Sequence, residues 1–115
     1  MSLCIYHNPR CSKSRDTLAL LEEKGLAPNI IKYLETPPDA GQISQLLSLL
    51  GMSSARQLMR TKEAVYKELE LAEVHDEQAL INAMVANPKL IERPIVVNGK
   101  QAALGRPPEQ VLDIL

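Results

Sequence analysis

The order of strand-like and helical patterns along the chain is the strongest constraint on its fold. Leu3–Tyr6 is a short apolar run typical of a buried strand, and a helical pattern over residues 12–24 follows and stops at Gly25. A second strand-like run covers Asn29–Leu34. A helix between two such strands predicts a βαβ unit, with parallel strands and a right-handed crossover.

The middle of the chain carries helical patterns only. Asp39 and Gln42 have the spacing of a capping box, and the helix that they introduce is predicted to stop at Gly51. Two further helical stretches are predicted, from about residue 54 to 71 and from about residue 76 to 86.

The C-terminal part returns to strand-like sequence. Residues 94–97 and 101–104 flank Asn98-Gly99, a dipeptide that supplies the positive φ angles of a tight turn, so an antiparallel hairpin is predicted. A short helix is predicted after Pro107-Pro108, because proline is tolerated in a first helical turn. Its apolar side chains are Val111, Leu112 and Leu115.

This succession of βαβ, a helical block and ββα predicts an α/β fold with a mixed sheet. It is the element order of a thioredoxin-like domain with helices inserted in its middle. We expect a single domain over residues 1–115, with the helical insertion at about residues 39–87. Arg93-Pro94 suits the position where that fold carries a cis-proline, so a cis bond there is a hypothesis.

Composition excludes several classes of protein. The formal net charge of -1 argues against a general nucleic-acid binder, so any basic site is a local cluster. No run approaches the roughly 20 apolar residues of a membrane span, and the N-terminus does not resemble a signal peptide. Two cysteines without a secretion signal suit a reducing compartment. We expect a cytoplasmic monomer, and no metal site, because His75 has no neighbouring Cys or His ligands in the sequence.

Cys11 is the residue most suited to chemistry. It lies at the start of the predicted helix, where unpaired N–H groups and the helix dipole stabilise a thiolate, which is the nucleophilic form. Arg10, Lys13 and Arg15 add positive charge, although the last two also suit an exposed helix face. His7 either tunes the thiol or is a polar residue at a strand end. The structural alternative for Cys11 is a small buried apolar residue.

Cys11 and Ser14 form a C-x-x-S motif, in which serine replaces the second cysteine of a redox pair. Such a site cannot close its own disulfide and needs an outside thiol. Ser14 either donates a hydrogen bond to a thiolate or oxyanion or is an ordinary first-turn serine. Cys4 is predicted to be structural. Its C-x5-R spacing to Arg10 matches a phosphatase loop, but the intervening residues include no glycine and Pro9 has no N–H.

Four segments, HNPRCSKSRDTL, YLETPP, RPIVV and GRPPEQVL, together resemble the glutaredoxin-coupled arsenate reductases. The likeness covers nearly the whole chain in the family's order. It implies a thioredoxin-like fold with a helical insertion, a cysteine that attacks arsenate and three arginines that hold the oxyanion. By the resemblance the nucleophile is Cys11, the residues that activate or orient it are His7 and Ser14, and the arginines are Arg60, Arg93 and Arg106.

The arginines also make physical sense, because planar guanidinium groups bind tetrahedral oxyanions through two hydrogen bonds. Arg56 lies one helical turn from Arg60 and is an alternative to it. The resemblance further implies glutathione as co-substrate, glutaredoxin as partner, no tightly bound cofactor and a role in arsenic detoxification. The chain stops soon after its predicted last helix, without the longer C-terminal tail of the best-known members, which leaves the oxyanion specificity open.

Two other functions stay open at this point. Spx-type relatives with a thioredoxin fold bind RNA polymerase as regulators, but those typically carry a C-x-x-C switch where this chain has C-x-x-S. A monothiol oxidoreductase that uses glutathione on a different substrate would need the same thiol chemistry.

Overall fold

The computed structural model describes residues 3–115, and contacts divide the chain into two compact units. The first unit runs through Thr36 and resumes at Arg93, and the second is Pro37–Glu92. The second unit contains the stretch 39–87 for which a helical insertion is predicted. That the two units form a single folding domain stays a prediction.

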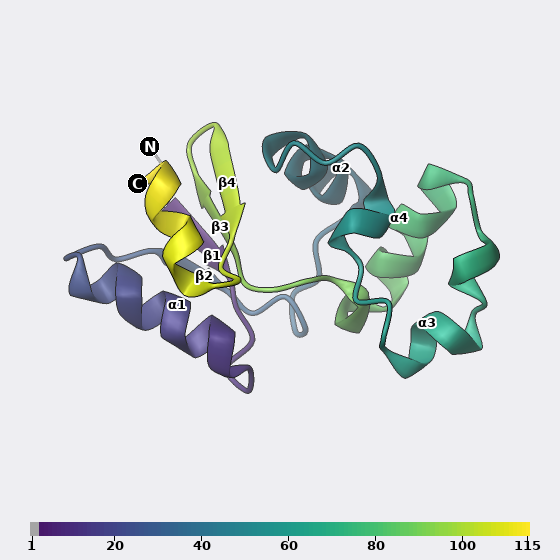
Figure 1. The fold of residues 1–115 in the computed structure, drawn as a ribbon, viewed down its shortest axis with the longest axis horizontal. Coiled ribbons are helices and arrows are strands. Elements are labelled where there is room, and N and C mark those ends of the chain that lie inside the picture. Colours follow the sequence, from purple (N-terminus) through teal and green to yellow (C-terminus); the bar gives the residue numbers. More distant parts are fainter. Residues whose placement is uncertain (1–2) are drawn as a thin grey trace. The chain divides into compact units, whose positions relative to one another are not determined.

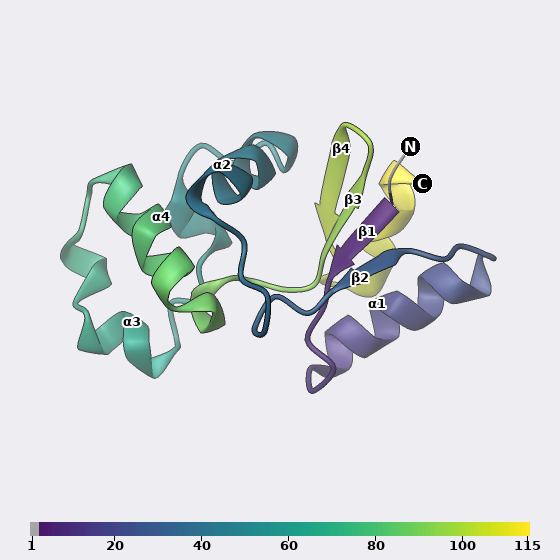
Figure 2. The same cartoon turned by 180° about the vertical axis from the view of Figure 1, so that it is seen from behind.

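The first unit is a mixed sheet with helices (Figure 1). Its elements are β1 (Leu3–Tyr6), α1 (Ser12–Glu23), β2 (Asn29–Ile31), β3 (Ile95–Asn98), β4 (Gln101–Leu104) and the 3-10 helix η4 (Pro108–Ile114). The strand order is β2-β1-β3-β4, with β1 parallel to β2 and antiparallel to β3, and β3 antiparallel to β4. Figure 2 shows the same strands from behind. The predicted α/β class with a mixed sheet is confirmed.

Helices α1 and η4 pack on the same face of this sheet. Their shared core is aliphatic, as a chain without Phe or Trp requires. It consists of Ile5, Leu21, Val96, Val111 and Ile114. A 3-10 helix has three residues per turn, so η4 buries Val111 and Ile114 on one side. Leu112 and Leu115, which the sequence assigned to the apolar face of this helix, are exposed.

The hairpin is confirmed, but its turn lies one residue later than predicted. Asn98 still belongs to β3 and pairs with Gln101, so the two central turn residues are Gly99 and Lys100. Gly99 has φ +63°, the conformation that a type II′ turn requires at its first central position. The amide of Asn98 instead donates to the Ile114 carbonyl at 2.7 Å and attaches the hairpin to η4.

The second unit is helical. Its elements are α2 (Ala40–Leu49), η1 (Ala55–Leu58), α3 (Ala64–Glu68), η2 (Leu71–Glu73), α4 (Glu77–Ala86) and η3 (Pro88–Leu90). The predicted capping box is present at α2: Asp39 Oδ1 accepts from the Gln42 N–H at 2.8 Å, and Gln42 Oε1 accepts from the Asp39 N–H at 2.9 Å. Gly51 follows α2 with φ +69°, as a helix stop should.

The prediction of one helix over residues 54–71 is wrong. An isolated bridge pairs Met59 with Ile91, and the Arg60 N–H donates to the Leu90 carbonyl at 2.7 Å. These bonds hold the chain extended after η1, so helix resumes only at α3. The amide groups are satisfied by a partner thirty residues away, which local helical periodicity cannot detect.

Two proline bonds are cis. Arg93-Pro94 confirms the hypothesis drawn from the sequence, and Arg106-Pro107 is a second cis bond that sequence reasoning did not anticipate.

Across residues 3–115, no helix has both the length and the apolar character needed to cross a membrane.

Gly105 lies where α1, the residue before β3 and the end of β4 meet. Its N–H donates to the Pro94 carbonyl at 3.0 Å, and its carbonyl accepts from Thr17 Oγ1 at 3.5 Å. A Cβ atom at this position would lie 2.3 Å from Thr17 Oγ1 and 2.7 Å from Pro94 Cγ. No residue with a side chain fits without moving one of these neighbours.

We therefore expect Gly105→Ala to lower the free energy of unfolding by about 1–3 kcal/mol, the usual cost of overpacking. Gly41→Ala is the matched control. Its Cβ would meet only Asp39 Oδ1 at 3.4 Å, and helical Ala is more stable than Gly by roughly 0.5–1 kcal/mol. Urea denaturation of both variants measures the difference. Equal stability of the two variants would show that the Thr17 contact relaxes without cost.

Candidate active site

Cys11 is the N-cap residue of α1, in the loop that follows β1. Its backbone is extended (φ -95°, ψ 123°), and its carbonyl accepts the first helical hydrogen bond from the Arg15 N–H at 3.0 Å. Its own N–H donates to the Asn8 carbonyl at 3.0 Å. The side chain is 9% exposed. The thiol thus lies at the helix N-terminus that the sequence predicts for it.

Opposing effects act on the pKa of the Cys11 thiol. Burial raises it, since a thiolate loses hydration. The Ser14 N–H and the charge of Arg93 lower it, and the Lys13 N–H and the charge of Arg106 lower it further. The balance is a pKa below the usual value for cysteine. The helix amides and the two arginines therefore favour the thiolate.

His7 and Ser14 form a buried polar pair beside this loop. His7 Nδ1 lies 2.6 Å from Ser14 Oγ, and the Asn8 N–H donates to the same oxygen at 3.0 Å. Burial lowers the pKa of His7, and the charges of Lys32 and Arg15 lower it further, so the imidazole is neutral at pH 7. It is the backbone N–H of Ser14 that stabilises the Cys11 thiolate, while its hydroxyl is held by His7 and Asn8.

Arg93 and Arg106 lie at the two ends of the hairpin. Arg93 precedes β3 and Arg106 follows β4, so the antiparallel pairing brings them to one end of the sheet. Arg106 Nη1 donates to the Arg93 carbonyl at 3.0 Å, which joins the two segments. Both charges act on the pKa of Cys11. Two guanidinium charges from the hairpin therefore favour the thiolate form of Cys11.

Arg60 belongs to the second unit, where its Nη1 lies 2.8 Å from a carboxylate oxygen of Glu63. Arg56, the alternative to it, is engaged differently. Its guanidinium donates to the Leu71 carbonyl at 3.0 Å and also to the Val74 carbonyl. Arg56 therefore holds η2 and the segment after it in place.

Asn8 is a residue that sequence reasoning missed. Its carbonyl accepts from the Cys11 N–H, its Oδ1 accepts from the Arg10 N–H at 3.0 Å, and its N–H donates to Ser14 Oγ. It thereby fixes the loop that carries the thiol. The dipeptide Asn8-Pro9 could have predicted this role from the sequence, because an Asn side chain commonly accepts a hydrogen bond from the backbone N–H two residues later.

The surroundings of Cys4 favour the protonated thiol. It is half-buried in β1 opposite Val97, and burial raises the pKa of its thiol despite a backbone hydrogen bond from Val97. Within residues 3–115, no three His, Cys, Asp or Glu side chains gather into a set that could hold a metal ion.

A cysteine at the N-terminus of the first helix, a βαβ unit followed later by a ββ-helix unit, and a mixed four-stranded sheet define a thioredoxin-like protein. The chain belongs to the ArsC family, whose sequence profile matches residues 6–114.

Two curated relatives and one solved structure illustrate the similarity. The arsenate reductase of Haemophilus influenzae is 51% identical over 116 residues, which cover all of both chains. Uncharacterized protein YfgD of Escherichia coli strain K12 is 63% identical over 96% of this chain and 94% of its own. The solved structure of the arsenate reductase from Vibrio cholerae, 58% identical, covers 100% of this chain and 98% of its own with a TM-score of 0.97.

The pKa of Cys11 can be tested by alkylation. Iodoacetamide reacts with the thiolate, so the rate at Cys11 should reach half its maximum at a lower pH than for an ordinary cysteine. Arg106→Gln should move that midpoint to higher pH, because it removes a charge that stabilises the thiolate. Mass spectrometry separates Cys11 from Cys4. An unchanged midpoint in Arg106→Gln, with the fold intact, would contradict the electrostatic account.

Proposed function

We propose that this protein reduces arsenate to arsenite with electrons from glutathione and with glutaredoxin as partner. The observation that carries the proposal is the position of Cys11 at the N-terminus of α1, where backbone N–H groups and the charges of Arg93 and Arg106 lower the pKa of its thiol. The names of the Haemophilus and Vibrio relatives support arsenate as the oxyanion.

In this proposal Arg60, Arg93 and Arg106 bind the arsenate oxygens and neutralise their charge beside Cys11. Guanidinium forks suit tetrahedral oxyanions, and their charge makes the approach of an anionic thiolate to an anionic substrate favourable. In the same scheme His7 and Ser14 orient the loop and stabilise the thiolate. The Ser14 hydroxyl is hydrogen-bonded to His7, and the Ser14 N–H is hydrogen-bonded to the Cys11 sulfur.

The first chemical step forms a bond between Cys11 Sγ and arsenic. The thiolate donates the electron pair, and one arsenate oxygen leaves as hydroxide or, after protonation, as water. The product is a Cys11–arsenate thioester in which arsenic is still As(V).

The second step is the reduction. A glutathione thiolate attacks Cys11 Sγ, the sulfur–sulfur bond forms, and the electron pair of the sulfur–arsenic bond stays on arsenic. Arsenic leaves as As(III) in arsenite, and Cys11 becomes a mixed disulfide with glutathione. A glutaredoxin thiolate then attacks the glutathione sulfur and releases the Cys11 thiolate. The serine in C-x-x-S suits this route, because the chain has no second cysteine in the motif to resolve the disulfide. No tightly bound cofactor is needed.

The direct test is NADPH consumption by purified protein with arsenate, glutathione, glutaredoxin and glutathione reductase. We expect turnover with the natural chain and with Cys4→Ser, and a loss of about a thousandfold or more in Cys11→Ser, because the nucleophile is removed. Full activity in a folded Cys11→Ser variant would overturn the mechanism. Folded natural protein without turnover would favour another oxyanion or a disulfide as substrate.

The role of Arg60 has its own test. Arg60→Gln should raise the KM for arsenate about tenfold, the typical loss for a hydrogen bond to a charged group, while the midpoint of Cys11 alkylation stays unchanged. Lys62→Gln, an exposed cation two residues away, is the matched control and should leave both quantities as they are. An arsenate KM in Arg60→Gln equal to that of the control would remove Arg60 from the oxyanion site.

A further inference from the structure

A pocket of about 310 Å³ opens beside the loop that carries Cys11, and the oxyanion scheme does not use it. Its walls are loop residues 7–10 and three residues after β2, namely Lys32, Leu34 and Glu35. All of them belong to the first unit. The volume is at the lower end of the range for small-molecule sites.

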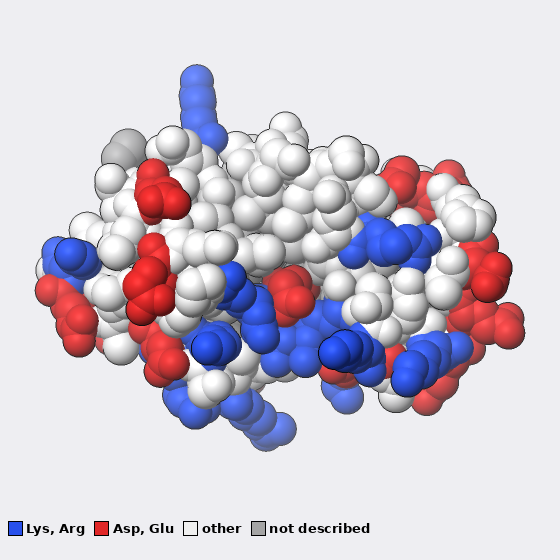
Figure 3. All heavy atoms as spheres, in the orientation of Figure 1, with Lys and Arg blue, Asp and Glu red and all other residues white. Residues whose placement is uncertain are grey.

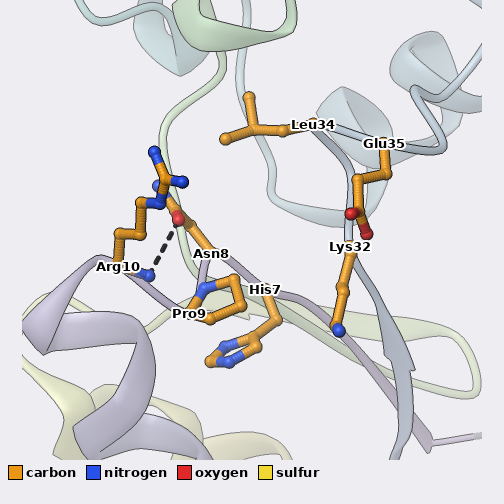
Figure 4. Close-up of a pocket in the computed structure, with 7 residues that line it drawn as sticks. All are labelled: His7, Asn8, Pro9, Arg10, Lys32, Leu34 and Glu35. Atoms are coloured by element: carbon orange, nitrogen blue, oxygen red, sulfur yellow. Dashed lines mark hydrogen bonds between the residues drawn. The ribbon is translucent and has the colours of Figure 1, made fainter.

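The pocket combines opposite charges with an apolar surface. Arg10 stands on one side and Lys32 and Glu35 on the other, with His7 and Pro9 between them (Figure 4). Leu34 is 42% exposed, so an apolar side chain is available to a ligand in this part of the pocket. The charged lining is thus two cations and one carboxylate. The face of the molecule in Figure 3 carries both Lys or Arg and Asp or Glu side chains.

We propose that this pocket binds the reducing co-substrate as a zwitterionic peptide thiol of the glutathione type. The inference rests on the proposed function in one respect, the need of Cys11 for an outside thiol. Glutathione carries two carboxylates and one ammonium group, whereas the pocket is lined by two cations, Arg10 and Lys32, and one carboxylate, Glu35. The charges of the pocket therefore complement those of the ligand in number and sign.

The same charges disfavour other ligands. A free oxyanion would gain from Arg10 and Lys32 but would be repelled by Glu35. An uncharged thiol would make no use of the three charged groups. Specificity for a zwitterion follows from attraction and repulsion together.

The pocket is preformed by the hydrogen bonds of its loop. Asn8 accepts from the Arg10 N–H with Oδ1 and from the Cys11 N–H with its carbonyl, both at 3.0 Å. Arg15 Nη1 donates to the Pro9 carbonyl at 3.0 Å and attaches the loop to α1. A fixed wall lowers the entropy that binding must remove.

The pocket and the reactive thiol share parts. His7 lines the pocket and lies 2.6 Å from Ser14, whose N–H stabilises the Cys11 thiolate. Arg10 lines the pocket and directly precedes Cys11 in the chain. A peptide thiol bound here is therefore held close to the loop from which Cys11 reacts, which raises its effective concentration.

Disulfide exchange at Cys11 tests the pocket without arsenate. The thiolate attacks glutathione disulfide, a bond forms between Cys11 Sγ and one glutathione sulfur, and the second glutathione leaves as thiolate. The same reaction with 2-hydroxyethyl disulfide, which is uncharged, measures the intrinsic reactivity of Cys11. The ratio of the two second-order rate constants reports recognition of the peptide alone, because any change in thiol reactivity affects both reactions.

We expect Lys32→Glu to lower this ratio about fivefold and Arg10→Glu with Lys32→Glu to lower it about tenfold or more, as loss and reversal of exposed ion pairs imply. Lys100→Glu, in the hairpin turn, makes the same change in net charge and should leave the ratio unchanged. A ratio that is the same in Lys32→Glu and Lys100→Glu would overturn the proposal.

A binding measurement separates this proposal from the proposed function. S-methylglutathione cannot react, so NMR titration with it reports the pocket alone, and we expect amide shifts confined to residues 7–10 and 32–35. Such shifts in a protein without arsenate turnover would support the pocket and count against the arsenate reaction. Arsenate turnover with a glutathione KM that is insensitive to Lys32→Glu, together with amide shifts outside residues 7–10 and 32–35, would support the arsenate reaction. The same result would overturn the proposal that this pocket binds the peptide thiol.

Discussion

The close approach at Gly105 is the constraint on which the arrangement of the site depends. The absence of a side chain there lets the Gly105 backbone lie against Thr17 of α1 and bond to Pro94. Arg93 and Arg106 are the residues next to this contact in the two segments. The packing of one glycine therefore holds the backbone beside Arg93 and Arg106 against α1, the helix that begins at Cys11.

The electrostatics of the thiol follow from that packing. Burial alone would keep Cys11 protonated, as it does for Cys4 in β1. The difference between the two cysteines is that Cys11 lies at a helix N-terminus with N–H groups and arginine charges directed at it. The position of each cysteine in the fold therefore decides the direction in which its pKa moves. The proposed chemistry uses the cysteine whose pKa is lowered.

Much of the fold was predictable because local patterns and local chemistry agreed. The strand Leu3–Tyr6, the helix after Cys11, the capping box at Asp39 and the hairpin all form within a few residues of the signals that predict them. The failures have non-local causes. The helix expected over residues 54–71 is interrupted by backbone pairing of Met59 with Ile91. Asn98, predicted in the hairpin turn, belongs to β3, where it pairs with Leu3 of β1 and its amide donates to the Ile114 carbonyl.

The sequence by itself predicted the candidate nucleophile and the class of chemistry proposed for it. A cysteine at a helix N-terminus has backbone N–H groups that favour its thiolate, and a serine three residues later excludes a local disulfide. The tertiary structure decided what surrounds that thiol. Three features join residues that are distant in sequence. They are the hydrogen bond from Arg106 to the Arg93 carbonyl, the hydrogen bond from Arg56 to the Leu71 carbonyl, and the mixed-charge pocket beside the Cys11 loop. Only packing sets distances between such residues, and electrostatic effects depend on those distances.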